Sequence, residues 1–169
     1  MRVNVPCARR RVPWTPAGAR AVAAHLPPLH QLGLDADDSL APGGPVGAAC
    51  AMVVGSWFLT REVELSTTRA CLVSLERGAD GEDLVKWCLP ASKTDTEARG
   101  VSRVHGCACV GGGVASCPVH AMQSQLARLR RIFPERWSAD GPHDDLPLFP
   151  TVNGDVVTKE AMTATMVAA

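Results

Sequence analysis

Three cysteines and two histidines fall within one short segment of the chain. They are spaced as His105-Gly-Cys107-Ala-Cys109, then seven residues, then Cys117-Pro-Val-His120. Thiolates and imidazole nitrogens are ligands that zinc prefers, and four of them close a tetrahedral site. We therefore expect a structural zinc site formed by Cys107, Cys109, Cys117 and His120, with His105 as an alternative ligand. A loop of reduced thiols is the competing interpretation, because the spacing is not that of a common zinc finger.

The elements on either side of this cluster predict how its ligands would meet. An extended segment over about 100–109 places the first histidine and two cysteines on one face, because side chains alternate along a strand. Apolar residues at helical spacing predict a helix over 118–133, with proline at its first position. Cys117 and His120 then lie on one side of its first turn. Three glycines, 111–113, allow the reversal between strand and helix.

The other elements predict an α+β fold, with helices around a small antiparallel sheet. Residues 47–60 are apolar nearly all round, which indicates a buried helix. Segments 70–76 and 84–89 flank a turn-rich stretch and predict two antiparallel strands joined by a hairpin loop. Thr158 is the expected cap of a last helix.

The charge and cysteine content limit the classes of protein to which the chain can belong. Seventeen basic and seventeen acidic side chains give zero net charge, so nucleic-acid binding would need a local patch. An odd total of seven cysteines, without an apolar secretion signal, indicates reduced thiols and an intracellular chain. No apolar run is long enough to span a bilayer, so we expect no membrane partner.

One local basic patch lies near the N-terminus. Residues 1–34 hold five arginines and no acidic side chain. We expect residues 1–44 to form a basic arm with a short helix and a loop, and residues 45–169 to form the folded domain with a Cys/His insertion at 105–120. The arm is a candidate phosphate contact, although a solvated arm without a partner would have the same composition.

A second set of residues could bind an anion. Arg61 directly follows the buried helix, and Glu64 lies three residues later, where one helical turn would bring its carboxylate to the guanidinium. Lys93, in Ser92-Lys93-Thr94-Asp95, follows the second predicted strand. By itself, the Arg61–Glu64 pair is equally typical of a structural salt bridge.

This order of buried helix, Arg-x-x-Glu-Leu, β-hairpin and lysine resembles the catalytic domain of tyrosine recombinases, also called phage-type integrases, over roughly residues 45–169. The resemblance implies that Arg61 binds the scissile phosphate, Glu64 orients Arg61, and Lys93 donates a proton to the leaving oxygen. It also implies duplex DNA as partner, DNA recombination or integration as activity, a mobile element as origin, and no cofactor for the chemistry.

The chain also departs from that family. It contains no tyrosine, the residue that attacks phosphorus in the family, and no His-x-x-Arg motif, and no glycine precedes Arg61 in Phe58-Leu59-Thr60. We therefore expect the N-terminal portion of such a domain, catalytically incomplete and retaining DNA binding at most. The nucleus is one location that this function would allow.

Basic residues of the predicted helix 118–133 are further candidates for DNA contact. Arg128, Arg130 and Arg131 near its end could bind the DNA backbone, although a solvated helix face has the same composition. The alternative function is a zinc-stabilised interaction module without catalytic activity, in which Arg61 and Lys93 are incidental surface residues.

Overall fold

The computed structural model describes residues 39–89, 100–109 and 116–168. Most of the predicted basic arm, Lys93 and the glycine turn at 111–113 therefore lie outside the described residues.

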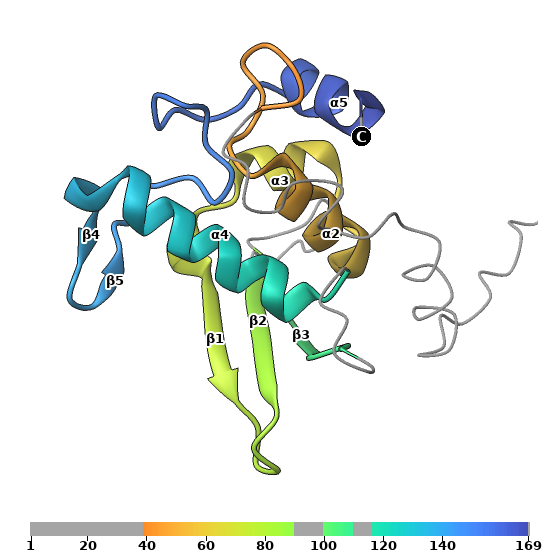
Figure 1. Cartoon of the computed structure of the whole chain (residues 1–169), viewed down its shortest axis with the longest axis vertical. Helices are drawn as coiled ribbons and strands as arrows, with labels where there is room; N and C mark the ends of the chain where they lie inside the picture. Colours follow the sequence, from red (N-terminus) through yellow and green to blue (C-terminus); the bar gives the residue numbers. More distant parts are fainter. Residues whose placement is uncertain (1–38, 90–99, 110–115, 169) are drawn as a thin grey trace, which may run out of the picture.

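The described residues form an α+β arrangement, which confirms the predicted class (Figure 1). Four α-helices accompany a small antiparallel sheet, and a two-stranded hairpin follows the longest helix. The helices are α2 (Ala48–Phe58), α3 (Glu62–Thr67), α4 (Pro118–Ile132) and α5 (Lys159–Ala168); the strands are β1 (Val73–Arg77), β2 (Asp83–Leu89), β3 (Val101–Gly106), β4 (Trp137–Ser138) and β5 (Gly141–Pro142). None of the helices among these residues is long and apolar enough to cross a membrane.

The larger sheet has β2 at its centre, with β1 and β3 antiparallel on either side. On β2, Val85 and Trp87 are fully buried and face the helices. Trp87 lies opposite Val73 of β1 and Arg103 of β3. Helix α4 packs against both β2 and β3 and crosses in front of the strands in Figure 1. The sheet therefore has one covered face, as a small antiparallel sheet usually does.

The first strand begins later than the sequence predicts. Residues Ala70–Leu72 form a 3-10 turn instead of extended backbone, and β1 starts at Val73. The cause lies in a distant segment: the N–H of Ala70 donates to the carbonyl of Leu146 (2.9 Å), and the N–H of Leu148 donates to the carbonyl of Thr68 (2.8 Å). These long-range bonds fix the backbone at 68–70, and no local sequence pattern signals them.

Helix α2 is buried over nearly its whole length, as its composition predicts. Its last residue, Phe58, is fully buried and packs edge-on against Trp87, with ring centroids 5.1 Å apart. Leu59 caps the end of the helix and adopts the left-handed conformation at φ 52°. This turn directs the chain out of the core, and Arg61 is the cap residue of α3.

A buried glutamine connects α4 to two other parts of the chain. The amide nitrogen of Gln125 donates to the carbonyls of Val46 (3.3 Å) and Leu148 (2.8 Å). Its amide oxygen accepts a hydrogen bond from Arg128 (2.8 Å). Since a buried amide left without partners would cost about 1–3 kcal/mol, these bonds fix how α4 lies against its neighbours.

The segment between α4 and α5 is held by Arg136. Its guanidinium donates to the carbonyl of Gly154 (2.8 Å) and pairs with Asp145 (3.0 Å). Helix α5 then begins as predicted, since the N–H of Ala161 donates to the hydroxyl of Thr158 (3.1 Å).

Substitution of Gly47 by alanine tests the packing around the glutamine. Gly47 has φ +73°, and a Cβ there would collide with side-chain atoms of Gln125 and Arg128. We expect G47A to lower the free energy of unfolding by about 2–5 kcal/mol, from left-handed strain and overpacking together. Urea denaturation measures the change.

The matched control is Gly43→Ala, because Gly43 has φ +66° but nothing lies within 4 Å of the position that a Cβ would take there. Gly43→Ala should lower the free energy of unfolding by the left-handed strain alone, roughly 1–2 kcal/mol. Equal losses in the two variants would contradict the packing described for Gln125.

Candidate metal centre

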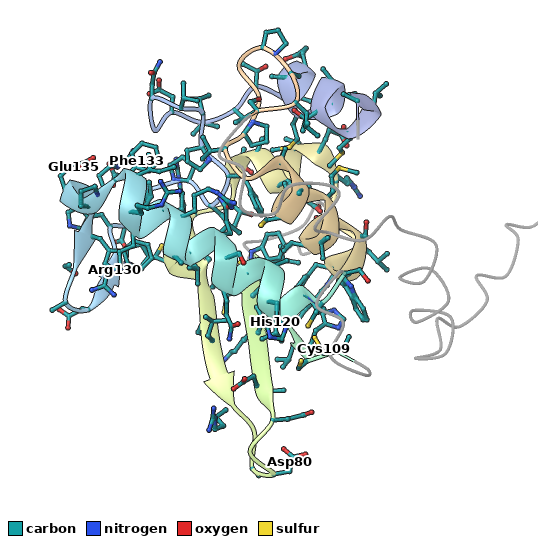
Figure 2. The ribbon with its side chains drawn as sticks, viewed as in Figure 1. Asp80, Cys109, His120, Arg130, Phe133 and Glu135 are labelled. Carbon is teal, nitrogen blue, oxygen red and sulfur yellow. The ribbon has the colours of Figure 1, made fainter. Side chains whose placement is uncertain are left out.

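The end of β3 and the start of α4 bring together the four residues for which the sequence predicts a metal site. The N–H of Cys107 donates to the carbonyl of Asp83 (3.0 Å), so strand pairing continues one residue beyond Gly106. Cys117 is the cap residue of α4, and His120 lies in its first turn. Figure 2 shows Cys109 and His120 together at this end of α4.

The distances within this group, here called the Cys3His cluster (Cys107, Cys109, Cys117 and His120), are compatible with one bound metal ion. All four ligand atoms lie within 4.8 Å of one another. The Sγ atoms of Cys107 and Cys117 are 3.7 Å apart. His120 Nδ1 is 3.2 Å from Cys109 Sγ and 3.9 Å from Cys107 Sγ.

Ordinary zinc bond lengths provide the comparison. Zn–S bonds of about 2.3 Å and Zn–N bonds of about 2.0–2.1 Å at tetrahedral angles put two sulfurs about 3.8 Å apart, and a sulfur and a nitrogen about 3.6 Å apart. The observed sulfur–sulfur separation of 3.7 Å is close to the first value. The two sulfur–nitrogen separations, 3.2 and 3.9 Å, lie below and above the second. The donor set and its spacing therefore fit one metal ion, so the cluster could hold one.

His105, the alternative ligand, is not part of the cluster. Its ring packs edge-on against Trp57 and Phe58 of α2, with centroid distances of 5.5 and 4.7 Å. Burial lowers the pKa of His105, and the nearby positive charge of Arg103 lowers it further. The imidazole therefore joins β3 to α2, and the structure favours His120 as the nitrogen ligand.

Contacts around the cluster hold its sulfurs in position. The backbone N–H of Ala108 donates to Cys117 Sγ (3.3 Å), and the indole N–H of Trp57 donates to the carbonyl of Ser116 (2.6 Å). Such outer contacts orient ligands and raise metal affinity. Neither Trp57 nor Ser116 was predicted to act at this site, because no motif marks a residue that acts only through a tertiary contact.

Solvent reaches the cluster from one side. Cys117 is buried at 2% exposure, whereas Cys107 is exposed. Burial raises the pKa of the Cys109 thiol to about 12, and the thiols of Cys107 and Cys117 contribute to the increase. The Cys109 thiol therefore holds its proton at neutral pH, whereas a bound metal would replace that proton and offset the repulsion between thiolates.

The predicted phosphate-binding arginine lies on the surface. Arg61 is exposed, and its backbone N–H donates to the Glu64 carboxylate (2.9 Å). No ion pair between the two side chains is found within the described residues, so the expected contact to the guanidinium is replaced by a contact to the backbone. Glu64 thus fixes the main chain at Arg61 and leaves its guanidinium exposed.

The arginines of α4 have different surroundings. Arg128 is 4% exposed and donates to Gln125 (2.8 Å) and to Cys50 Sγ (3.5 Å). It is therefore buried, whereas the predicted DNA contact requires a surface position. Arg130 and Arg131 are exposed near the opposite end of α4 from the Cys3His cluster, where Figure 2 labels Arg130. Their contact with DNA stays a prediction.

No protein-family model matches the chain, and no curated protein and no solved structure matches it either.

Cobalt(II), which reports tetrahedral thiolate coordination by its absorption, tests the cluster. We expect the wild type to bind one equivalent. Cys109→Ser should weaken binding by more than about tenfold, since losing even an outer contact costs about 10–100-fold. Cys88→Ser is the matched control, because Cys88 is exposed on the far face of the sheet against Ser102 (3.2 Å). Equal affinity in the two variants would contradict a metal site at Cys109.

Proposed function

We propose that this chain is a tyrosine-recombinase-like domain that binds duplex DNA through its phosphates, and that a structural zinc ion in the Cys3His cluster stabilises it. The observation that carries the DNA-binding part is the exposed guanidinium of Arg61 on the turn between α2 and α3. Arginine is suited to this role because its planar fork matches the geometry of phosphate oxygens.

The acidic neighbours of Arg61 on α3 are engaged elsewhere. Glu62 pairs with Lys159 of α5 (3.5 Å), and Glu64 accepts the backbone N–H of Arg61 (2.9 Å). Neither forms an ion pair with the guanidinium within the described part of the chain. The charge of Arg61 is therefore available to an external anion.

The strand end that leads to Lys93 lies near this turn. Strand β2 ends at Leu89, opposite Val101 of β3. Two residues further along β3, Arg103 donates to the carbonyl of Phe58, three residues before Arg61. Lys93 itself lies outside the described residues, so a phosphate site that it shares with Arg61 stays a prediction.

The chemistry proposed for this chain stops at phosphate binding. Strand cleavage needs a nucleophile in line with the leaving oxygen, and the family's nucleophile is a tyrosine, which the 169 residues lack. Positive charge around the phosphate can still hold DNA. We therefore infer a binding domain that does not cleave DNA by itself.

Fluorescence anisotropy with a labelled duplex tests DNA binding. We expect binding at about 50 mM salt that weakens steeply as salt rises, because phosphate contacts release counterions. Arg61→Ala should weaken binding about tenfold and reduce the salt slope by about one. Arg77→Ala is the control, because Arg77 pairs with Asp83 at the hairpin end of the sheet (3.2 Å). A duplex that fails to bind even at low salt would contradict the proposed function.

A zinc-stabilised module without DNA binding is the second candidate. The 3.7 Å sulfur–sulfur separation in the cluster favours it as much as it favours the first, since a closed four-ligand site is structural. The burial of Arg128 also removes one of the charges on which DNA contact was predicted.

Metal removal tests the structural zinc ion, which is part of both proposed functions. We expect one zinc per chain and a chelator-induced fall in Tm of about 5 °C or more, because each kcal/mol shifts the Tm of a domain this size by about 2–4 °C. Cys109→Ser protein should show a lower Tm that the chelator does not change. A purified chain without zinc, with a Tm indifferent to chelator, would overturn the zinc proposal.

A further inference from the structure

Arg103 of β3 lies where the sheet meets the end of α2. It shares a strand face with His105, whose ring packs against Phe58 (4.7 Å). Its guanidinium donates from one nitrogen to the carbonyl oxygen of Phe58. Phe58 is the last residue of α2, so this bond satisfies a carbonyl at the helix end, where positive charge is favoured.

One hydrogen bond uses only part of this side chain. Arginine carries five N–H donors, and Arg103 remains exposed despite the contact. No carboxylate forms an ion pair with Arg103 among the residues that the structure describes. The contact to Phe58 thus holds the guanidinium at the surface and uses only one of its N–H donors.

Arg61 is connected to the same end of α2 through the backbone. It follows Phe58 by three residues, after the left-handed turn at Leu59. Phe58 is fully buried, so the backbone to which Arg61 and Arg103 are both connected is held by the core. Both exposed arginines are thus attached to the end of α2, Arg103 by its hydrogen bond to Phe58 and Arg61 through three residues of chain.

We infer that Arg61 and Arg103 form one binding site for a phosphodiester group of the DNA backbone. This inference rests on the proposed function and adds a second phosphate contact to it. Bidentate and charge-assisted hydrogen bonds from guanidinium to phosphate are among the strong hydrogen bonds in proteins. The bond to Phe58 would limit the side-chain entropy that Arg103 loses when the phosphate binds.

The same bond could also serve only to cap α2, and the two roles predict different results. An arginine that only caps the helix is replaceable by any side chain that donates to the carbonyl. A phosphate contact needs the positive charge as well. Arg103→Gln separates these roles, because glutamine keeps an N–H donor and loses the charge.

The experiment compares R103Q, R103A, R61A and wild type by anisotropy on one duplex at several salt concentrations, with Tm measured for each. We expect R103Q to keep a Tm close to the wild type, to bind about tenfold more weakly at low salt, and to reduce the salt slope by about one. The control is Arg77→Gln, which removes the same charge at the hairpin end of the sheet and should leave DNA affinity nearly unchanged.

Three outcomes would overturn the inference. If R103Q binds DNA like the wild type while R61A binds weakly, Arg103 only caps α2 and the proposed function stands. If R103Q and R77Q weaken binding equally, the effect is one of overall charge. If the wild type does not bind the duplex at all, both the inference and the proposed DNA function fail.

Discussion

Where the edge strand β3 meets the first turn of α4, four potential ligand atoms lie within 4.8 Å of one another, and a metal ion bound to them would fix this junction. From it, α4 runs across β2 and β3 towards the hairpin β4–β5 (Figure 1). Further along α4, Gln125 binds the carbonyls of Val46 and Leu148, which lie before α2 and after the hairpin. Gln125 therefore fixes both flanking segments against α4, and a metal ion in the cluster would also fix the start of the helix.

The sheet–helix junction also determines where positive charge reaches the surface. His105 and Arg103 lie on the face of β3 that meets α2, and both contact Phe58, one by ring packing and one by a hydrogen bond. Arg61 leaves the end of the same helix. A metal at the Cys3His cluster would fix the strand that carries Arg103, because Cys107 follows β3 directly. In this way a structural ion that never contacts DNA would still influence the geometry of a phosphate site.

Four arginines of the described chain show two different roles. Arg128 is 4% exposed within a polar network in the core, and Arg136 holds the segment before α5 through Gly154 and Asp145. Arg61 and Arg103 are exposed and have no carboxylate partner within the described residues. Because a buried guanidinium is retained for its internal hydrogen bonds, a count of basic residues along a helix overestimates the charge that a nucleic acid would meet.

The α+β class, the buried helix, the strand pair, α4 and α5 could all be predicted from the sequence, because each depends on a local periodicity or on a cap such as Thr158. The sequence also identified the four residues of the Cys3His cluster, since strand and helix periodicities place their side chains on matching faces. Three other features follow from long-range packing: the place of His120 in the cluster instead of His105, the start of β1 at Val73, and the burial of Arg128. Each of these depends on a contact with a segment distant in sequence, and local spacing carries no information about such a partner.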